Sequence, residues 1–496
     1  ILPDGSPQPA TAGAGGAQAP RPAERTLPDG TRLRLEYDPA GRVVAEVDPA
    51  GRRTAFAYDP EGRLLDVTLP TGATESLTYD LEGRPDTLTT AAGDLFLYRY
   101  DRQGRLLERT FPDGSSESYE YAADGLLERT TGAWGTTRYE RDAASGRLAR
   151  LTLPDGRYVR YEYDSRGQPL SVAHAAVAGA PETVTRYAYD AAGRVVSVSS
   201  AEGTFRLRYD SAGRREAVER PNGVTSSYRY DARDRVTGVE HRAPGGALLA
   251  TFVPSDAPGG AGPPARPLGA GQSAPDRAGN RSEVGGQRLV YDSAARLLRL
   301  EPPGQASVAY TFGPNGWRQS RSDALGTVYY LFDERPLPGD VAGGRVLRES
   351  DRSGGVLREF VYLPEDPLPL AWTEGGRATF PLDDGAGSVR LLTDPAGNVL
   401  ARFDVPPGQP ASGPASAPRS ATAPPRPGSG SDPLFWRGQR WDGAGTLLVA
   451  LDGLAIDPQD EAPVNRLTGW PTIDTRFQFP ERRGYSGLEP TRPPAG

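Results

Sequence analysis

A Tyr-Asp dipeptide followed by Gly-Arg recurs along the first half of the chain at a nearly constant spacing. The first tyrosines of this series are each 21 residues apart, and the full series is Tyr37, Tyr58, Tyr79, Tyr100, Tyr121, Tyr163, Tyr189, Tyr209 and Tyr230. A fixed period of this length is typical of repeat architectures, in which each unit packs against its neighbours. The chain is therefore expected to form an array of similar units.

Each unit has the pattern of a β-hairpin. Apolar and polar residues alternate before the tyrosine, so that Leu33, Leu35 and Tyr37 share one strand face. The next four residues, 38–41, read Asp-Pro-Ala-Gly. This order suits a type I turn, because Asp bonds the following backbone, Pro presets φ and Gly accepts a left-handed conformation. The pattern predicts that the repeat tyrosines lie on one sheet face.

A second set of turns repeats at twice that spacing, every 42 residues, beginning at Pro28, Pro70, Pro112 and Pro154. These turns would close the hairpins at the opposite edge. About ten hairpins correspond to roughly twenty strands, and open twisted sheets rarely exceed about ten strands without curling or closing. The expected fold is all-β, a large antiparallel sheet of repeated β-hairpins of about 21 residues each that must wrap around.

The motif Tyr-Asp-x-x-Gly-Arg resembles the repeat of the RHS or YD-repeat family, which includes bacterial RHS cores of polymorphic toxins and teneurin-like YD shells. The resemblance is strong over residues 25–240. Residues 380–389 and 393–399 are similar to a segment near the end of the family's core, with Pro381 in place of the family's His. The resemblance implies that the β-sheet spirals into a hollow or partly open shell, which in bacteria often encloses a C-terminal toxin polypeptide.

The motif residues are expected to have a structural role in the repeats. They are Tyr37, Asp38, Gly41, Arg42, Tyr58, Asp59, Gly62, Arg63, Tyr79, Asp80, Gly83, Arg84, Tyr100, Asp101, Gly104, Arg105, Tyr163, Asp164, Tyr189, Asp190, Gly193, Arg194, Tyr209, Asp210, Gly213, Arg214, Tyr230 and Asp231. No catalytic, cofactor-binding or metal-binding residue is assigned.

The remaining composition offers little for catalysis. Cysteine is absent, and the two histidines, His174 and His241, have no His or Cys neighbour at metal-ligand spacing, so both are expected at the surface. Asp383 and Asp384 would point to opposite faces of an extended strand. The net charge of −7 predicts no nucleic-acid surface, and no apolar run reaches about 18 residues. We expect no enzyme activity, no cofactor and no membrane span.

Composition, the repeat motif and the resemblance together divide the chain into six segments. They are a Pro/Ala/Gly-rich disordered or linker segment (1–24) without a visible signal peptide, regular YD-repeat β-hairpins (25–241), a Pro/Gly-rich loop or linker (242–286), degenerate RHS core repeats (287–404), a Pro/Ser-rich loop (405–432), and an eroded RHS core C-terminal element with a tail (433–496). Because the chain contains no Met, we expect a processed product or a fragment.

Two functions remain open at this point. The resemblance implies a non-enzymatic β-shell that acts as scaffold or encapsulating carrier in a secreted or contact-dependent toxin system. Its partner would be an encapsulated toxin polypeptide or a secretion-system component, and its location would be secreted or on the bacterial cell surface. The alternative is a carbohydrate-binding or adhesive cell-surface repeat protein, in which Trp436 and Trp441 stack on glycans.

Overall fold

The computed structural model describes residues 24–26, 32–175, 179–253 and 282–402, the last range with short gaps at 285, 293–295, 314–316, 336–344, 386 and 388. Between residues 434 and 463 it describes the backbones of short strands. Every helix or strand element in the described part is a β-strand, and the strands form three antiparallel sheets. The described residues include no helix long and apolar enough to span a membrane.

The first sheet has 22 strands, and each strand pairs with the next one along the chain. The strands are β1 (Glu24–Thr26), β2 (Arg32–Tyr37), β3 (Val43–Val47), β4 (Arg53–Tyr58), β5 (Leu64–Thr68), β6 (Thr74–Tyr79), β7 (Pro85–Thr89), β8 (Leu95–Tyr100), β9 (Leu106–Thr110), β10 (Ser116–Tyr121), β11 (Leu127–Gly132), β12 (Gly135–Arg141), β13 (Leu148–Thr152), β14 (Tyr158–Tyr163), β15 (Pro169–Ala175), β16 (Thr183–Tyr189), β17 (Val195–Ser200), β18 (Gly203–Tyr209), β19 (Arg215–Glu219), β20 (Thr225–Tyr230), β21 (Val236–Arg242) and β22 (Leu248–Phe252). This meander confirms the predicted hairpin array.

The Tyr-Asp hairpins close with the predicted turn. In the first of them the Gly41 N–H donates to the Asp38 carbonyl at 2.9 Å, and the Asp38 N–H donates to the Arg42 carbonyl at 3.0 Å. Gly41 has a φ of 91°, in the left-handed region that favours glycine. The strand register then shifts between Glu36 and Tyr37, and the same shift precedes the tyrosine in later repeats. Such bulges increase local twist, which helps the sheet to curve.

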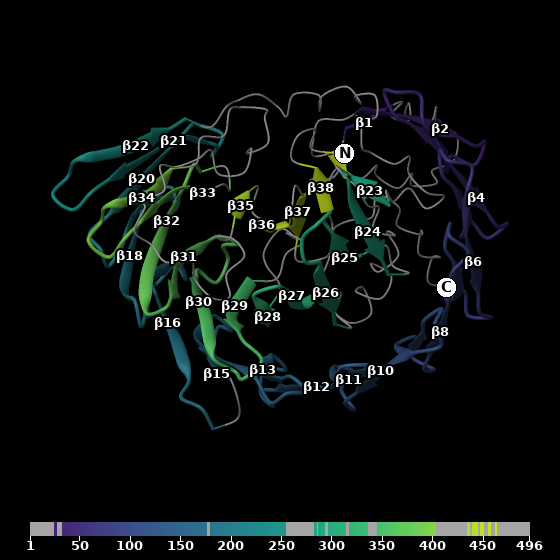
Figure 1. The fold of residues 1–496 in the computed structure, drawn as a ribbon, viewed down its shortest axis with the longest axis horizontal. Helices are drawn as coiled ribbons and strands as arrows, with labels where there is room; N and C mark the ends of the chain where they lie inside the picture. The colour runs from purple at the N-terminus through teal and green to yellow at the C-terminus, as the bar shows by residue number, and fades with distance from the viewer. Residues whose placement is uncertain are drawn as a thin grey trace.

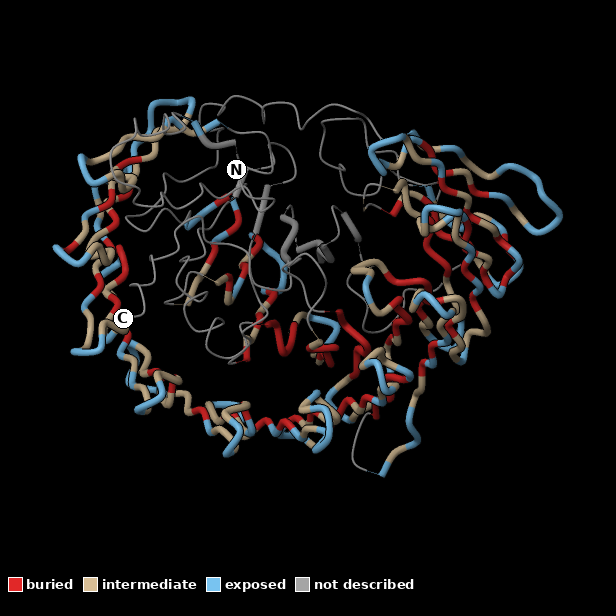
Figure 2. Tube along the Cα trace, turned by 180° about the vertical axis from the view of Figure 1, so that it is seen from behind, coloured by how far each residue is buried: buried red, intermediate tan, exposed pale blue. Residues whose placement is uncertain are grey.

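The first sheet curves through most of a turn and remains open, running from β2 past β8 and β12 to β21 and β22 (Figure 1). Along β8, Phe96 is buried whereas Leu95 and Leu97 are exposed, and Tyr98 and Tyr100 follow Phe96 on the more buried face. Buried and exposed residues alternate in this way around the wall (Figure 2). The repeat tyrosines share one face, as the alternation in the sequence predicts.

A second sheet of 12 strands lies within the curve of the first (Figure 1). Its strands are β23 (Glu283–Val284), β24 (Gln287–Tyr291), β25 (Leu297–Glu301), β26 (Val308–Phe312), β27 (Arg318–Asp323), β28 (Gly326–Asp333), β29 (Arg345–Ser350), β30 (Val356–Tyr362), β31 (Pro369–Glu374), β32 (Arg377–Asp383), β33 (Val389–Thr393) and β34 (Val399–Arg402). Consecutive strands again pair antiparallel.

The largest apolar core joins these two sheets. It combines side chains of the first sheet, such as Val159 and Phe205, with side chains of the second, such as Phe360 and Phe380. The rings of Phe205 and Phe380 lie 6.0 Å apart across the interface. The smaller cores around β4 to β13 contain residues of the first sheet only. Over β14 to β21 the two sheets pack on one another, and we call this part the double wall. Over β4 to β12 the core residues come from the first sheet alone, and we call this part the single wall.

A third sheet has five short strands, whose side chains lie outside the described part of the structure. They are β35 (Leu434–Trp436), β36 (Gln439–Ala444), β37 (Leu447–Ala450), β38 (Ala455–Asp457) and β39 (Ala462–Pro463). Within the predicted linker 242–286, β22 continues the first sheet, and residues 254–281 lie outside the described residues. Most of the predicted segments 1–24 and 405–432 also lie outside them.

Candidate functional site

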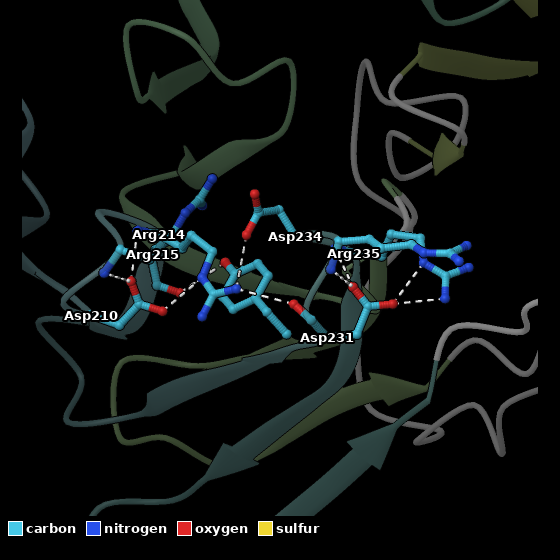
Figure 3. Close-up of polar contacts among 9 residues, drawn as sticks. Asp210, Arg214, Arg215, Asp231, Asp234 and Arg235 are labelled. Atoms are coloured by element: carbon cyan, nitrogen blue, oxygen red, sulfur yellow. Dashed lines mark hydrogen bonds and ion pairs between the residues drawn. The ribbon is translucent and has the colours of Figure 1, made fainter.

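The predicted motif residues gather where neighbouring hairpins meet, and the structure shows one arrangement repeated there. In the repeat that begins at Tyr209, the Asp210 carboxylate accepts the backbone N–H of Arg214 at 2.9 Å and its guanidinium N–H at 2.8 Å. The following repeat has the same geometry between Asp231 and Arg235 (Figure 3). The aspartate thus binds both the turn backbone and the side chain that leaves it. We call this arrangement the Tyr-Asp clasp.

The clasp lowers the pKa of the aspartate at Asp190 and Asp210. For Asp190 the main cause is the backbone N–H of Arg194, and the second is the Arg194 guanidinium. For Asp210 the backbone N–H of Arg214 again lowers the pKa most, and it outweighs the opposing effect of partial burial. Hydrogen bonds to a carboxylate favour its charged form, so Asp190 and Asp210 remain ionised acceptors. In both turns the clasp consists of an ion pair and hydrogen bonds between the aspartate and the arginine.

The arginine of each clasp also reaches the next repeat. The guanidinium carbon of Arg42 lies 5.0 Å from the centre of the Tyr58 ring, and Arg63 and Tyr79 repeat this contact at 4.8 Å. Further copies are Arg84 over Tyr100, Arg105 over Tyr121, Arg194 over Tyr209, Arg214 over Tyr230 and Arg296 over Phe312. A cation above an aromatic face is attractive by about 0.5–1 kcal/mol at exposed sites.

The tyrosine hydroxyl donates a hydrogen bond back to the preceding repeat. Tyr79 donates to the carbonyl of Leu64, the residue after the preceding clasp arginine, at 2.6 Å. The same bond joins Tyr58 to Val43, Tyr121 to Leu106, Tyr163 to Leu148, Tyr189 to Pro169, Tyr209 to Val195 and Tyr230 to Arg215. Burial raises the pKa of Tyr79 to about 12, so the hydroxyl keeps its proton as a donor.

The motif tolerates local substitutions within this geometry. At Asp164 the position of the arginine is held by Gln168, which still donates its backbone N–H to the Asp164 carboxylate at 2.8 Å. Its side-chain amide donates to the carbonyl of Gly193 in the next repeat at 2.6 Å. In the turn after Tyr230, Asp234 takes the left-handed conformation usually occupied by glycine, with a φ of 62°. Asp and Asn are the residues that best tolerate this region after glycine.

The interface between the two sheets contains polar residues that the sequence did not indicate. Both histidines were expected at the surface, and this expectation is wrong. His174 on β15 is 3% exposed and His241 on β21 is fully buried. Each lies against the second sheet, because the His241 Nε2 atom is 2.8 Å from the Asp383 carbonyl and the His174 Nδ1 atom is 4.0 Å from the Glu359 carboxylate.

Buried charges form a second group at this interface. Asp333, 2% exposed, pairs with Arg335 at 2.7 Å and also with Arg345. The Arg335 guanidinium lies 5.1 Å from the centre of the Tyr161 ring of the first sheet. Burial opposes the charge of Asp333, but the two arginines hold its pKa well below the usual range. These residues do not belong to the Tyr-Asp repeat, so the periodicity of the sequence does not identify them.

A cavity of about 410 Å³ lies where the second sheet leaves the first, between β11 to β14 and β27 to β30. Trp134, 39% exposed, lies at its edge together with Tyr329. The charged groups on its lining balance one another in part, since Asp155 pairs with Arg157 at 2.7 Å. Among the described lining residues, none selects one class of ligand. The expected sugar-stacking residues, Trp436 and Trp441, are on β35 and β36, whose side chains lie outside the description.

Comparison with family models agrees with this geometry. Residues 18–176 match the model described as Teneurin YD-shell, and residues 181–204 and 206–247 match the model described as RHS Repeat. These segments of the chain are therefore similar to RHS/YD repeats. The match confirms the resemblance drawn from the Tyr-Asp motif, and it covers most of the wall that the clasps build. A search among curated proteins returned no match.

Solved structures of similar fold contain TcdB2-TccC3. A crystal structure of TcdB2-TccC3 without its hypervariable C-terminal region matches with a TM-score of 0.52 and 15% identity, over 89% of this chain and 29% of that one. The structure of TcdB2-TccC3-Cdc42 matches with a TM-score of 0.51, also at 15% identity and over 89% and 29% of the two chains. This chain thus shares their fold and spans about 29% of their length.

Proposed function

We propose that this chain forms part of the wall of a β-shell that encloses a second polypeptide and serves as scaffold or carrier in an exported toxin system. One observation carries the proposal. The first sheet of 22 strands curves around an interior in which the second sheet lies. The fold shared with part of TcdB2-TccC3, 29% of that chain, supports it.

The clasps supply the physical reason why such a wall is suited to enclosure. A clasp holds its own turn through an ion pair, as between Asp59 and Arg63. It joins that turn to the next hairpin through a ring contact and a hydroxyl bond, which Tyr79 makes with Arg63 and Leu64. Stability then accumulates from neighbour to neighbour, as in other repeat proteins, and the wall does not need a filled centre. A curved sheet of this kind can surround a guest without packing tightly against it.

Protease protection in the protein encoded by the complete reading frame tests this function. The expected result is that peptides from outside the repeat region resist proteinase K in the native protein and are cut at once after the shell is unfolded in denaturant. Electron microscopy should show a particle with low central density around those peptides. Equal cleavage of these peptides before and after unfolding, together with a solid particle, would contradict the proposal.

Export is part of the same proposal, and secretion or cell-surface display of the complete protein is its direct readout. The glycan-binding alternative rested on Trp436 and Trp441, for whose side chains the structure describes no contact. No observation in the described residues favours it over enclosure. A glycan array with the purified protein, followed by Trp436→Ala and Trp441→Ala, remains its test.

A further inference from the structure

The only two histidines of the chain both lie between the sheets, and His241 makes a specific bond to each side. Its Nε2 atom is 2.8 Å from the Asp383 carbonyl oxygen on β32. A carbonyl only accepts hydrogen bonds, so Nε2 must carry the proton. Its Nδ1 atom is 2.7 Å from the Ser226 hydroxyl on β20. In the neutral ring this nitrogen accepts the hydroxyl proton, and both ring nitrogens are satisfied.

A cation already occupies the neighbourhood of His241. The Arg220 guanidinium donates to the Ser226 hydroxyl at 2.6 Å and to the Pro381 carbonyl on β32 at 3.3 Å. The carboxylate of Asp383, the other charged group facing the ring, accepts the Tyr228 hydroxyl at 3.1 Å. The ring of Phe252 lies 5.7 Å away on β22 and adds no charge. A proton on Nδ1 would therefore place a second positive charge beside Arg220.

His174 is also buried, between β15 and β30, but its Nδ1 atom lies 4.0 Å from the Glu359 carboxylate, beyond hydrogen-bond distance. The Glu359 carboxylate near its Nδ1 atom already accepts the Thr183 hydroxyl at 2.7 Å and pairs with Arg348. The other charged groups that act on His174 are Glu182, which pairs with Arg160 at 2.8 Å, and the Asp333 cluster. The nearby carboxylates thus have arginine partners. A protonated His174 would be an additional buried cation.

We propose that His174 and His241 form an acid-sensitive latch between the two sheets, in which the interface accommodates both rings only in the neutral form, His241 bonds the second sheet, and protonation releases that sheet. The latch goes beyond the enclosing function and does not depend on it, because it concerns how the two layers of this chain hold together. Loosening of the inner layer would open the double part of the wall and leave the clasps of the single part intact.

The direction of the effect follows from the two pKa values. Burial is the main cause that lowers the pKa of both histidines from the ordinary 6.5 to about 4. The second cause is the charge of a nearby arginine, Arg348 for His174 and Arg220 for His241. Between about pH 4 and pH 6.5 the two imidazoles bind protons when the sheets are separated and remain neutral when the sheets are joined. The latch is therefore complete above about pH 6.5 and weakens as the pH falls toward 4. Each histidine changes the separation equilibrium by about tenfold per pH unit in that window.

Spin labels can report the separation directly, since the chain has no native cysteine. Leu170 on β15 and Val356 on β30 are exposed, at 40% and 49%, and accept labelled cysteines outside the core. The distance between the labels is measured against urea concentration at pH 7.5 and pH 4.5. The expected result is one distance in the joined state and a lower urea midpoint for the longer distance at pH 4.5.

The matched variant carries His174→Gln and His241→Gln, because a glutamine amide can still donate to a carbonyl and does not titrate. We expect most of the acid shift in the urea midpoint to disappear in this variant, with only the contribution of carboxylates left. An equal shift in both proteins would overturn the latch. If the variant fails to fold, NMR titration of the two wild-type imidazoles decides. Rings that stay neutral through pH 5 support the latch, and rings that titrate near 6.5 overturn it.

Discussion

The wall of this protein is built in two ways, and the difference separates local from long-range causes of stability. Over β4 to β12 the cores draw on the first sheet alone, and neighbouring hairpins are joined by clasps. Over β14 to β21 the clasps continue, but the same face also packs on the second sheet. Residues 157 and 330, which form a bond across this interface, are 173 positions apart.

This comparison shows what each kind of contact can do. A clasp connects residues at most about one repeat apart, as between Tyr79 and Leu64, so its loss affects one joint of the array. The interlayer contacts bury charges such as Asp333 and rings such as Phe380, so their loss leaves unpaired charge or empty space. We therefore expect substitutions in the double wall to cost more than chemically similar ones in the single wall.

The largest difference is expected for an aspartate that holds buried cations. Asp333→Ala leaves Arg335 and Arg345 without their shared carboxylate, and breaking a buried pair in this way costs about 3–5 kcal/mol. Asp48→Ala is the control, because Asp48 pairs in the single wall with Arg52, whose side chain is 65% exposed. The loss of this surface pair and of the two backbone N–H bonds that the Asp48 carboxylate accepts in its turn should cost about 1–2 kcal/mol. Urea unfolding of both variants measures the difference. Similar losses would remove the distinction between the two walls.

A pair of leucines tests apolar packing in the two regions. Leu331 and Leu106 are both fully buried, the first in the interlayer core and the second in a core of the first sheet alone. Changing each to Ala should cost about 2–5 kcal/mol, with Leu331 toward the upper end. A wall with one layer can relax around the lost side chain more readily than a packed double layer. A larger free-energy loss for Leu106→Ala would show that the single wall is the more rigid part.

Within the single wall, the two edges provide a sharper test of the clasp. Arg84 pairs with Asp80, lies over the Tyr100 ring at 5.0 Å and donates to the Asp101 carbonyl at 2.7 Å. Arg84→Met should lose about 1–2 kcal/mol of unfolding free energy. Arg52→Met is matched to it, because Arg52 makes the same ion pair with its turn aspartate at 2.6 Å on the opposite edge. There the expected loss is at most about 0.5 kcal/mol.

The smallest effect is expected for a single hydroxyl. Tyr79→Phe removes the bond to the Leu64 carbonyl and keeps the ring under Arg63, so the net loss is about 0.5–1.5 kcal/mol. Tyr187→Phe makes the same change in the double wall, where the hydroxyl donates to the Tyr362 carbonyl at 3.2 Å across the interface. Hydrogen exchange near each acceptor should locate the first loss within one repeat and the second in both sheets. Exchange confined to one repeat in both variants would contradict this.

The amino-acid sequence alone determined the repeat. Asp38 and Gly41 specify a turn through local hydrogen bonding and a left-handed backbone, and the alternation around Tyr37 specifies the sheet face. These interactions act over a few residues, so a period of 21 positions is enough to predict the hairpin, the antiparallel sheet and its tendency to curl. The link from each arginine to the next tyrosine follows once the hairpins stand side by side.

Only the tertiary structure decided how the layers meet. His241 and Asp383 touch across 142 positions, and His174 and Glu359 come from strands with no common period. In a repeat array many strands have similar apolar faces, so the sequence does not say which of them a distant strand will cover. That choice depends on the summed packing of two whole sheets. For this reason the histidines, expected at the surface, lie between the sheets, where burial lowers their pKa.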